Sequence, residues 1–258
     1  MTRAPLFEAS RLTLEAGSRV LVQGLSFSIR PGEVWGMLGR NGAGKTTFLH
    51  AAVGLRAPDA GSLSLCGSPL EDWNEPEAAR RRAFLPQAFH DPFSARVIDT
   101  VLVGRHPHLS RWDWEGDGDM ALAAAALDVV DLAGFEDRDV LTLSGGERQR
   151  VALAAVLVQE TALLLLDEPV AHLDLHHQSM VLEHLVHLAH HQGRGVLFTA
   201  HDLNIAARYA THAVLLTPGG GALQGAVHEV MTERILSDAF GHRVTRLQGA
   251  GHPVFVPE

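Results

Sequence analysis

The chain has 258 residues, 46% of them hydrophobic and 20% charged, so it is long enough to bury a substantial core and is expected to be globular. Its 21 basic and 30 acidic residues give a formal net charge of −9, and no lysine- or arginine-rich tract is present, which argues against a nucleic-acid partner. Cys66 is the only cysteine, which excludes an intrachain disulfide and favours a reducing compartment.

The first third of the chain predicts strands that lead into a glycine-rich loop. Residues 6–30 alternate in short polar and apolar steps, which predicts antiparallel strands. An apolar strand at 34–38 then enters the loop, and a helix follows the loop. Further strands are expected at 62–67 and 83–87, with a helix over 77–82 between them.

The remainder predicts a helical insertion followed by alternating strands and helices. Residues 88–155 show helical periodicity without a strand-like run. Apolar strands near 163–168, 196–201 and 213–216 then alternate with helical segments, as in a parallel sheet. The longest apolar runs, such as 162–166, are far shorter than the ~20 residues that span a bilayer, and the amino terminus lacks the apolar core of a signal peptide. We therefore expect membrane contact to go through a partner.

A complete phosphate-binding motif lies between the strand at 34–38 and the helix that follows. GRNGAGKT fits G-x-x-x-x-G-K-[ST] in the strand–loop–helix context that this pattern requires. Glycines let backbone N–H groups close around phosphate oxygens, Lys45 reaches the β- and γ-phosphates, and Thr46 is a ligand for Mg²⁺. The expected nucleotide-binding residues are Gly39, Arg40, Asn41, Gly42, Ala43, Gly44, Lys45, Thr46 and Thr47.

Polar residues follow three of the predicted strands, at the edge of the sheet where ligands of α/β folds bind. After LLLL, Asp167 is expected to hold Mg²⁺, while Glu168 orients or deprotonates the water that attacks the γ-phosphate. Gln87 can supply a further oxygen to the metal or the water, and His201 can donate to a γ-phosphate oxygen. Read alone, the acid pair also fits a solvated strand end, and Gln87 and His201 are ordinary residues.

LSGGERQR, at 143–150, predicts a second anion site in the helical segment. Ser144 and Glu147 fit a capping box, and Gly145 and Gly146 leave the first-turn amides open to a ligand. A plain helix cap is the alternative, but two glycines in a first turn cost ~1 kcal/mol each in helix propensity. If this turn binds the γ-phosphate of a second subunit's nucleotide, two copies form a head-to-tail pair with two identical sites.

The motifs in this order, with Leu173–Asp174 and His201, resemble the ATP-binding cassette of ABC transporters over nearly the whole chain. The resemblance implies a P-loop NTPase fold with a RecA-like core, an amino-terminal antiparallel β subdomain and an inserted helical subdomain. One ABC ATPase domain over 1–258 would contain a core lobe of 1–87 and 156–258 and a helical subdomain of 88–155. It also implies catalytic roles for Glu168, His201 and Gln87, a Mg²⁺ site at Thr46, Gln87 and Asp167, and ATP contacts from Ser144, Gly145, Gly146 and Asp174 across a homodimer.

The resemblance further implies a peripheral subunit on the cytoplasmic side of the inner membrane. Its partners would be two transmembrane permease subunits, one of whose helices enters a groove after Gln87, and indirectly a periplasmic binding protein. GRHPH at 104–108, HLDLHHQ at 172–178 and HDLNIAARYA at 201–210 are similar to importers of iron chelates, haem or cobalamin, and the cargo stays open among these. A ribosome- or DNA-repair-associated ABC ATPase is the alternative function.

Two departures from the family pattern and one histidine cluster leave questions open. VAH stands where the family commonly has small hydroxyl residues before Leu173–Asp174. The aromatic residue that usually stacks on adenine is missing near Ala16, so either that position is vacant, which we favour, or Arg19 lays its guanidinium on the base. His184, His187 and His191 share a helix face, but no cysteine or carboxylate completes a ligand set, and we expect a solvated face.

Overall fold

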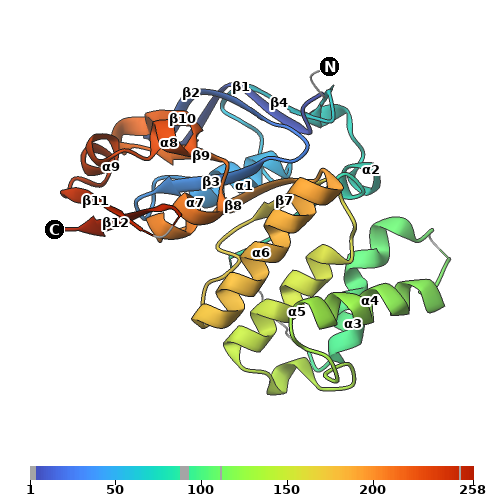
Figure 1. Ribbon diagram of the computed structural model, residues 1–258. Helices are drawn as coiled ribbons and strands as arrows, with labels where there is room; N and C mark the ends of the chain where they lie inside the picture. The colour runs from blue at the N-terminus through green and yellow to red at the C-terminus, as the bar shows by residue number, and fades with distance from the viewer. Residues whose placement is uncertain (1–3, 88–92, 111, 250) are drawn as a thin grey trace.

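The structure is a computed structural model that describes residues 4–87, 93–110, 112–249 and 251–258. Two sheets and a hairpin alternate with helices (Figure 1). The strands are β1 (Phe7–Ala16), β2 (Arg19–Ile29), β3 (Val34–Gly39), β4 (Ala60–Leu65), β5 (Ser68–Pro69), β6 (Arg82–Leu85), β7 (Leu163–Leu166), β8 (Gly195–Thr199), β9 (His212–Leu216), β10 (Ala222–Ala226), β11 (Val244–Gln248) and β12 (Pro253–Pro257). The α-helices are α1 (Lys45–Ala52), α2 (Glu75–Ala79), α3 (Val97–Leu102), α4 (Asp117–Val129), α5 (Gly145–Leu157), α6 (Leu175–Gln192), α7 (Leu203–Tyr209), α8 (Val227–Val230) and α9 (Glu233–Phe240).

The larger sheet forms the centre of the molecule. Its strand order is β10-β9-β3-β8-β7-β6, and every neighbouring pair is parallel except β10 with β9. In β7, Leu163 and Leu165 belong to one core, while Leu164 and Leu166 belong to the core on the opposite face. A strand that is buried on both faces reads as a continuous apolar run, which explains LLLL.

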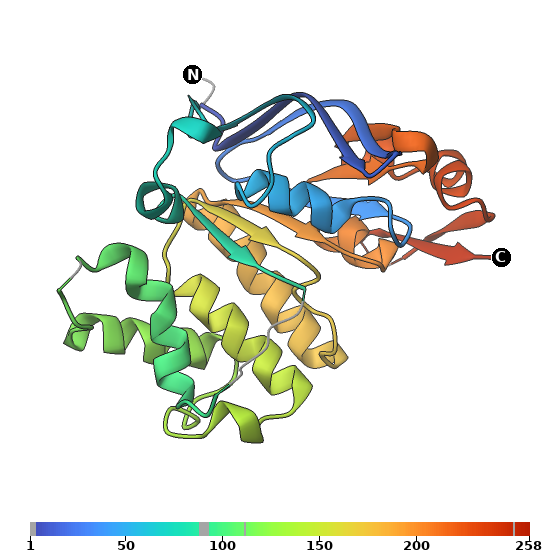
Figure 2. The same ribbon diagram turned by 180° about the vertical axis from the view of Figure 1, so that it is seen from behind.

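The antiparallel sheet predicted for residues 6–30 is confirmed, with strand order β2-β1-β4-β5. Helix α1 lies between this sheet and the central sheet (Figure 2). Its Phe48 ring contacts Phe7 and Phe27, with ring centroids 6.1 and 5.7 Å apart. This packing fixes the direction of α1, and the phosphate loop precedes its first residue.

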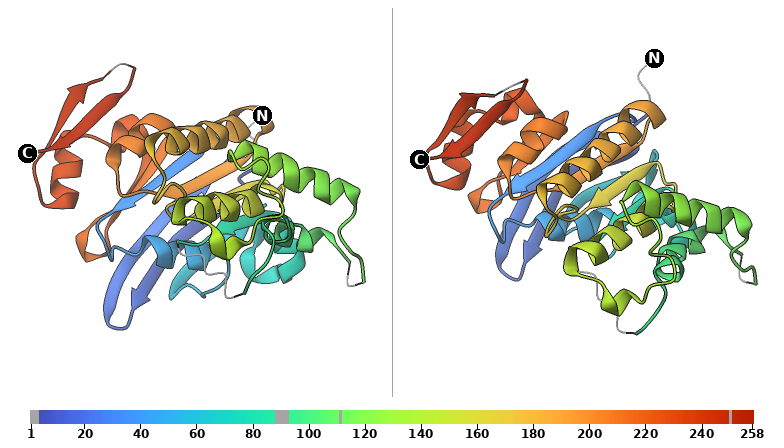
Figure 3. Two further views of the ribbon diagram at one scale, coloured as in Figure 1. Left: turned by 90° about the horizontal axis from the view of Figure 1, so that it is seen from below. Right: turned by 60° about the horizontal axis from the view of Figure 1, so that its bottom comes forward.

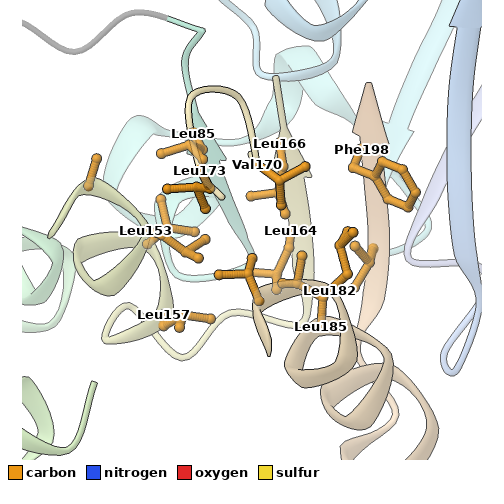
Figure 4. Packing of buried hydrophobic residues seen from close by; sticks show 14 of the residues in the cluster. Leu85, Leu153, Leu157, Leu164, Leu166, Val170, Leu173, Leu182, Leu185 and Phe198 are labelled. Atoms are coloured by element: carbon orange, nitrogen blue, oxygen red, sulfur yellow. The ribbon is translucent and has the colours of Figure 1, made fainter. Parts of the chain in front are cut away.

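The opposite face of the central sheet is covered by α5, α6 and α7. Figure 4 shows how leucines of α5 and α6 converge on β7. The labelled residues of this contact are Leu153, Leu157, Leu164, Leu166, Leu182 and Leu185. Helices α3, α4 and α5 pack on one another and form a separate helical lobe beside α6 (Figure 1).

The carboxyl-terminal elements α8, α9, β11 and β12 were not predicted from the sequence. Hairpin β11–β12 stands at the edge of the molecule away from the helical lobe (Figure 3). It is joined to α7 because Asn204 accepts a hydrogen bond from Phe255 N (2.7 Å) and donates one to Phe255 O (3.2 Å).

Two local predictions were wrong in their bounds. The helix expected over 77–82 ends at Ala79, because Arg82 already pairs with Leu163 as the first residue of β6. Strand β6 ends at Leu85, so Gln87 lies in the loop beyond it. The predicted lobe boundary at residue 88 lies outside the described residues, and α5 continues to Leu157, past the boundary at 155. Within the described part of the chain, no helix is long and apolar enough to cross a membrane.

Candidate functional site

The phosphate loop requires glycine at the positions where the sequence has it. Gly42 and Gly44 have φ values of 72° and 105°, in the region that favours glycine. A Cβ on Gly44 would lie 2.9 Å from the Cβ of Leu21 on β2, and a Cβ on Gly39 would lie 2.9 Å from the carbonyl oxygen of Leu216. The loop therefore packs closely against β2 and β9.

Lys45 lies at the start of α1 and is nearly buried, with 6% exposure. Its Nζ donates to the carbonyl oxygen of Gly39 (2.9 Å), which folds the side chain back over the loop. Burial lowers the pKa of Lys45, and the carboxylates of Glu168 and Asp167 act in the opposite direction. The ammonium group is thus held at the loop with two carboxylates close to it.

Asp167 is fully buried directly after β7, and neighbours hold both of its carboxylate oxygens. Thr46 Oγ1 donates to Oδ2 (2.7 Å), and Thr199 Oγ1 donates to Oδ1 (2.6 Å). The Thr199 hydroxyl also accepts a hydrogen bond from Glu168 N (2.8 Å). Thr46 and Asp167, two of the three predicted Mg²⁺ ligands, therefore lie in contact and offer the hard oxygen atoms that this ion prefers.

Glu168 has a backbone φ of 52°, which is uncommon outside glycine and occurs often at functional sites. Its Oε1 lies 2.5 Å from His201 Nε2 and accepts a hydrogen bond from Gln87 Nε2 (3.1 Å). Among the described residues no hydrogen bond is made to Oε2. Gln87 and His201, which follow two other strands of the same sheet, therefore meet on the carboxylate of Glu168.

The side chains of Lys45, Thr46, Gln87, Glu168 and His201 line a single open cavity of about 440 Å³. Its described lining residues are Ala16, Arg19, Leu21, Asn41, Gly42, Ala43, Gly44, Lys45, Thr46, Thr47, Gln87, Glu168 and His201. None of them is Phe, Tyr or Trp. Arg40 lines a neighbouring cavity instead, and Arg19 borders both.

The second predicted anion site lies elsewhere in the chain, at the start of α5. Ser144 Oγ accepts a hydrogen bond from Glu147 N (3.3 Å), and Glu147 Oε2 accepts one from Ser144 N (2.7 Å), so the capping box is formed. A Cβ on Gly145 would meet no described atom within 4 Å. Neither Ser144, Gly145, Gly146 nor Asp174 lines the cavity at the phosphate loop. Within one subunit, the structure thus leaves these residues apart from the nucleotide cavity.

Thr199 was missed by sequence reasoning, although it belongs to the site. The available signal was a single polar residue at the end of the apolar strand VLFT. In the predicted histidine cluster, the rings of His187 and His191 have centroids 4.6 Å apart. Within the described ranges, no group of three or more His, Cys, Asp or Glu side chains is arranged to hold a metal ion.

The ABC transporter family model matches residues 22–171, which include the phosphate loop, Gln87, the capping box and the acid pair. The chain belongs to the ABC transporter family. It is 42% identical to the hemin import ATP-binding protein HmuV of Myxococcus xanthus, with 91% of this chain and 90% of that protein covered. It is also 42% identical to the cobalamin import ATP-binding protein BtuD of Halobacterium salinarum, with 89% of this chain and 57% of that protein covered.

Solved structures of ABC proteins agree with this fold. A chain from a metal-chelate type ABC transporter in an inward-facing conformation has a TM-score of 0.86 and 29% identity, with 99% of this chain and 98% of that chain covered. The predicted fold class, a P-loop NTPase with an antiparallel β subdomain and a helical insertion, is confirmed. As an ABC ATP-binding subunit, the protein is an ATPase.

Proposed function

We propose that this protein is the ATP-hydrolysing subunit of an ABC importer for haem, cobalamin or an iron chelate. The observation that carries the hydrolytic part is the convergence of Lys45, Glu168, Gln87 and His201 on one cavity. Asp167 is buried beneath that cavity and is hydrogen-bonded to Thr46, which lines it. The importer part rests on the hemin and cobalamin import proteins that the chain resembles along almost its whole length.

Binding of the nucleotide is assigned to the phosphate loop. Backbone N–H groups from Gly42 to Thr47 and the positive end of α1 would surround the phosphate oxygens, and Lys45 would leave the Gly39 carbonyl to reach the β- and γ-phosphates. Thr46 and Asp167, with Gln87, would hold Mg²⁺, which neutralises phosphate charge when bound.

Hydrolysis is assigned to Glu168. Because His201 and Gln87 both contact Oε1, the carboxylate is held in one orientation and Oε2 remains to accept a proton. A water molecule would give that proton to Oε2 as its oxygen attacks the γ-phosphorus, and the bond from the γ-phosphorus to the β-phosphate oxygen would break. Gln87 and His201 therefore act on the base, and His201, which lines the same cavity, would also donate to an oxygen of the γ-phosphate.

The exposed turn at Ser144 is assigned to the nucleotide of a second copy. The first N–H groups of a helix have no partner within the helix, and here only that of Glu147 is taken by the Ser144 side chain. Two copies arranged head to tail would place each turn against the partner's phosphate loop, which is the homodimer that the motif order implies.

Mixing two inactive variants tests this composite site. Lys45→Ala damages the phosphate loop and Ser144→Arg blocks the turn, so each homodimer has two damaged sites. In an equal mixture, half of the dimers are heterodimers with one intact site, and about a quarter of the wild-type ATPase activity should return if the two sites act independently. Heterodimers isolated by two different tags should also retain one ATP per dimer. Heterodimers without ATP would contradict the arrangement.

A groove beside Gln87 is assigned to the permease. This cavity of about 630 Å³ is mostly apolar and is bordered by Pro86, Phe93 and Val103. Phe93 and Val103 are 79% and 54% exposed, which is high for apolar residues on a molecule without a partner. Val103→Glu should abolish co-sedimentation with membranes that contain the permease and leave ATP binding intact. Leu223→Glu, on β10, should leave both co-sedimentation and ATP binding unchanged. Recovery with ribosomes instead of membranes would favour the alternative, non-transport function.

A further inference from the structure

The segment after the acid pair, residues 172–174, is held by a histidine. We call this segment the D-loop and call residues 144–147 the signature turn. Asp174 caps α6, since its Oδ1 accepts a hydrogen bond from His177 N (3.0 Å). The ring of the same histidine contacts the carboxylate, with Nδ1 2.9 Å from both Oδ1 and Oδ2. Asp174 is thus bound twice by one residue.

The other ring nitrogen of His177 reaches the helical lobe. His177 Nε2 lies 3.2 Å from Oδ2 of Asp131, a residue 46 positions earlier that follows α4. Both aspartate side chains are 66% exposed, whereas His177 is 19% exposed between them. The ring of His177 thus has a carboxylate beside each of its two nitrogens. His177 therefore bridges two segments that are distant in sequence.

Asp131 is in turn connected to the helix that carries the signature turn. It has a φ of 56°, and its carbonyl oxygen accepts a hydrogen bond from Nη1 of Arg150 on α5 (2.7 Å). The same Nη1 donates to the carbonyl of Val130 (2.9 Å) and lies 3.7 Å from Asp131 Oδ2. Arg150 is almost buried, with 8% exposure, so this end of the connection is firmly anchored.

The D-loop and the signature turn also contact each other directly. A Cβ on Gly146 would lie 3.2 Å from the carbonyl oxygen of His172, so the backbone of the D-loop packs on the signature turn. Asp174, His177, Asp131 and Arg150 then form a second connection between the same two segments, through side chains.

We propose that His177 is a positioning residue that holds the D-loop and the signature turn as one unit against the partner subunit's nucleotide. This proposal rests on the composite site of the proposed dimer, in which both segments act on the partner. Misplacement of a binding group by about 1 Å weakens its contact strongly, so a site shared between subunits gains from a fixed spacing between these two segments. His177 does not line the nucleotide cavity of its own subunit, and it acts only through Asp174 and Asp131.

The test uses ATP-driven dimerisation in a Glu168→Gln background, measured by sedimentation. His177→Gln should weaken the ATP-bound dimer about tenfold or more, because the glutamine amide cannot reach both carboxylates. The affinity of the isolated subunit for ATP, measured by titration at low protein concentration, should stay unchanged. His190→Gln is the control, because His190 is an exposed histidine in the last turn of the same helix, at the end away from Asp174 and His177.

A double-mutant cycle with Asp131→Asn separates the bridge from a general loss of stability. If the bridge exists, His177→Gln should weaken the dimer of the Asp131→Asn variant little further. An unchanged dimer constant for His177→Gln, additive effects of the two substitutions, or an equal loss of ATP affinity in the isolated subunit would each overturn the proposal. If the parent Glu168→Gln protein does not dimerise with ATP at all, the proposed dimer itself fails.

Discussion

Replacement of Thr199 by valine tests whether the acid pair depends on one buried hydroxyl. Thr199 is 1% exposed at the end of β8, and its Oγ1 makes two hydrogen bonds, to Asp167 Oδ1 (2.6 Å) and from Glu168 N (2.8 Å). Valine has nearly the same shape, so Thr199→Val removes both bonds without opening a cavity. It leaves a buried carboxylate oxygen and a backbone N–H without their partner.

The expected destabilisation follows from these two losses. A hydrogen bond to a charged group contributes about 1.5–3 kcal/mol, and one between neutral groups about 1 kcal/mol. Thr199→Val should therefore lower the free energy of unfolding by about 2–4 kcal/mol, which corresponds to a fall in Tm of roughly 5–15 °C for a chain of this size. Since Asp167 is a proposed Mg²⁺ ligand, affinity for the metal or ATPase activity should also fall about 10- to 100-fold.

Denaturant unfolding and ATPase assays at varied Mg²⁺ concentration measure the two effects. Thr199→Ser is the control, because it keeps the hydroxyl and loses one methyl group, a change of about 1 kcal/mol. The reasoning is refuted if Thr199→Val is as stable as the wild type and needs no more Mg²⁺. It is also refuted if Thr199→Ser is as damaging as Thr199→Val, since methyl packing would then account for the effect.

Three further predictions concern the base, the nucleobase and the signature turn. Glu168→Gln should reduce hydrolysis by ~10²-fold or more while ATP still binds, and near-normal turnover would remove Glu168 from its role. No Phe, Tyr or Trp is among the described residues that line the cavity, so Ala16→Tyr should tighten ATP binding by about 5- to 150-fold if the stacking position is vacant. Arg19→Ala should weaken ATP binding only if the guanidinium already lies on the base. Titrations of both variants with ATP and GTP distinguish these two cases. The hydroxyl and backbone N–H of Ser144 hold the pKa of Glu147 below its ordinary value of 4.5. The ionised carboxylate of Glu147 therefore contributes fully to stability above pH 4.5, and this contribution is lost as the pH falls through the lower pKa of the folded state. Glu147→Gln should reduce this loss as the pH falls below 4.5. Equal slopes for variant and wild type in pH-dependent unfolding would argue against the cap.

Local patterns were sufficient to predict the phosphate loop and the capping box. In GRNGAGKT, the glycines permit positive φ values and the lysine follows at once, so the site is contained in one stretch of chain. The capping box needs only Ser144 and Glu147, one helical turn apart. LLLL likewise predicts a strand buried on both faces, because a strand with one face in water alternates apolar and polar residues.

The contacts around Glu168 were decided by the order of the strands in the sheet. Gln87 is 81 residues before Glu168 and His201 is 33 residues after it, and they meet because β6, β7 and β8 are neighbours in the sheet with parallel directions. Residues with suitable chemistry could be chosen from the sequence, but the sequence could not show that Gln87 and His201 both contact Oε1 of Glu168.

By itself, then, the sequence determined the features that depend on neighbouring residues: most strands and helices, the phosphate loop, the capped turn and the adjacent carboxylates of the acid pair. The tertiary structure alone decided that Thr199 holds Asp167 and Glu168, that Asn204 fastens the terminal hairpin, and that His177 joins Asp174 to Asp131. The physical reason is that each of these contacts joins chain segments through single polar side chains, which leave no periodic pattern. Their partners are set only when the packing of the whole chain brings the segments within hydrogen-bond distance.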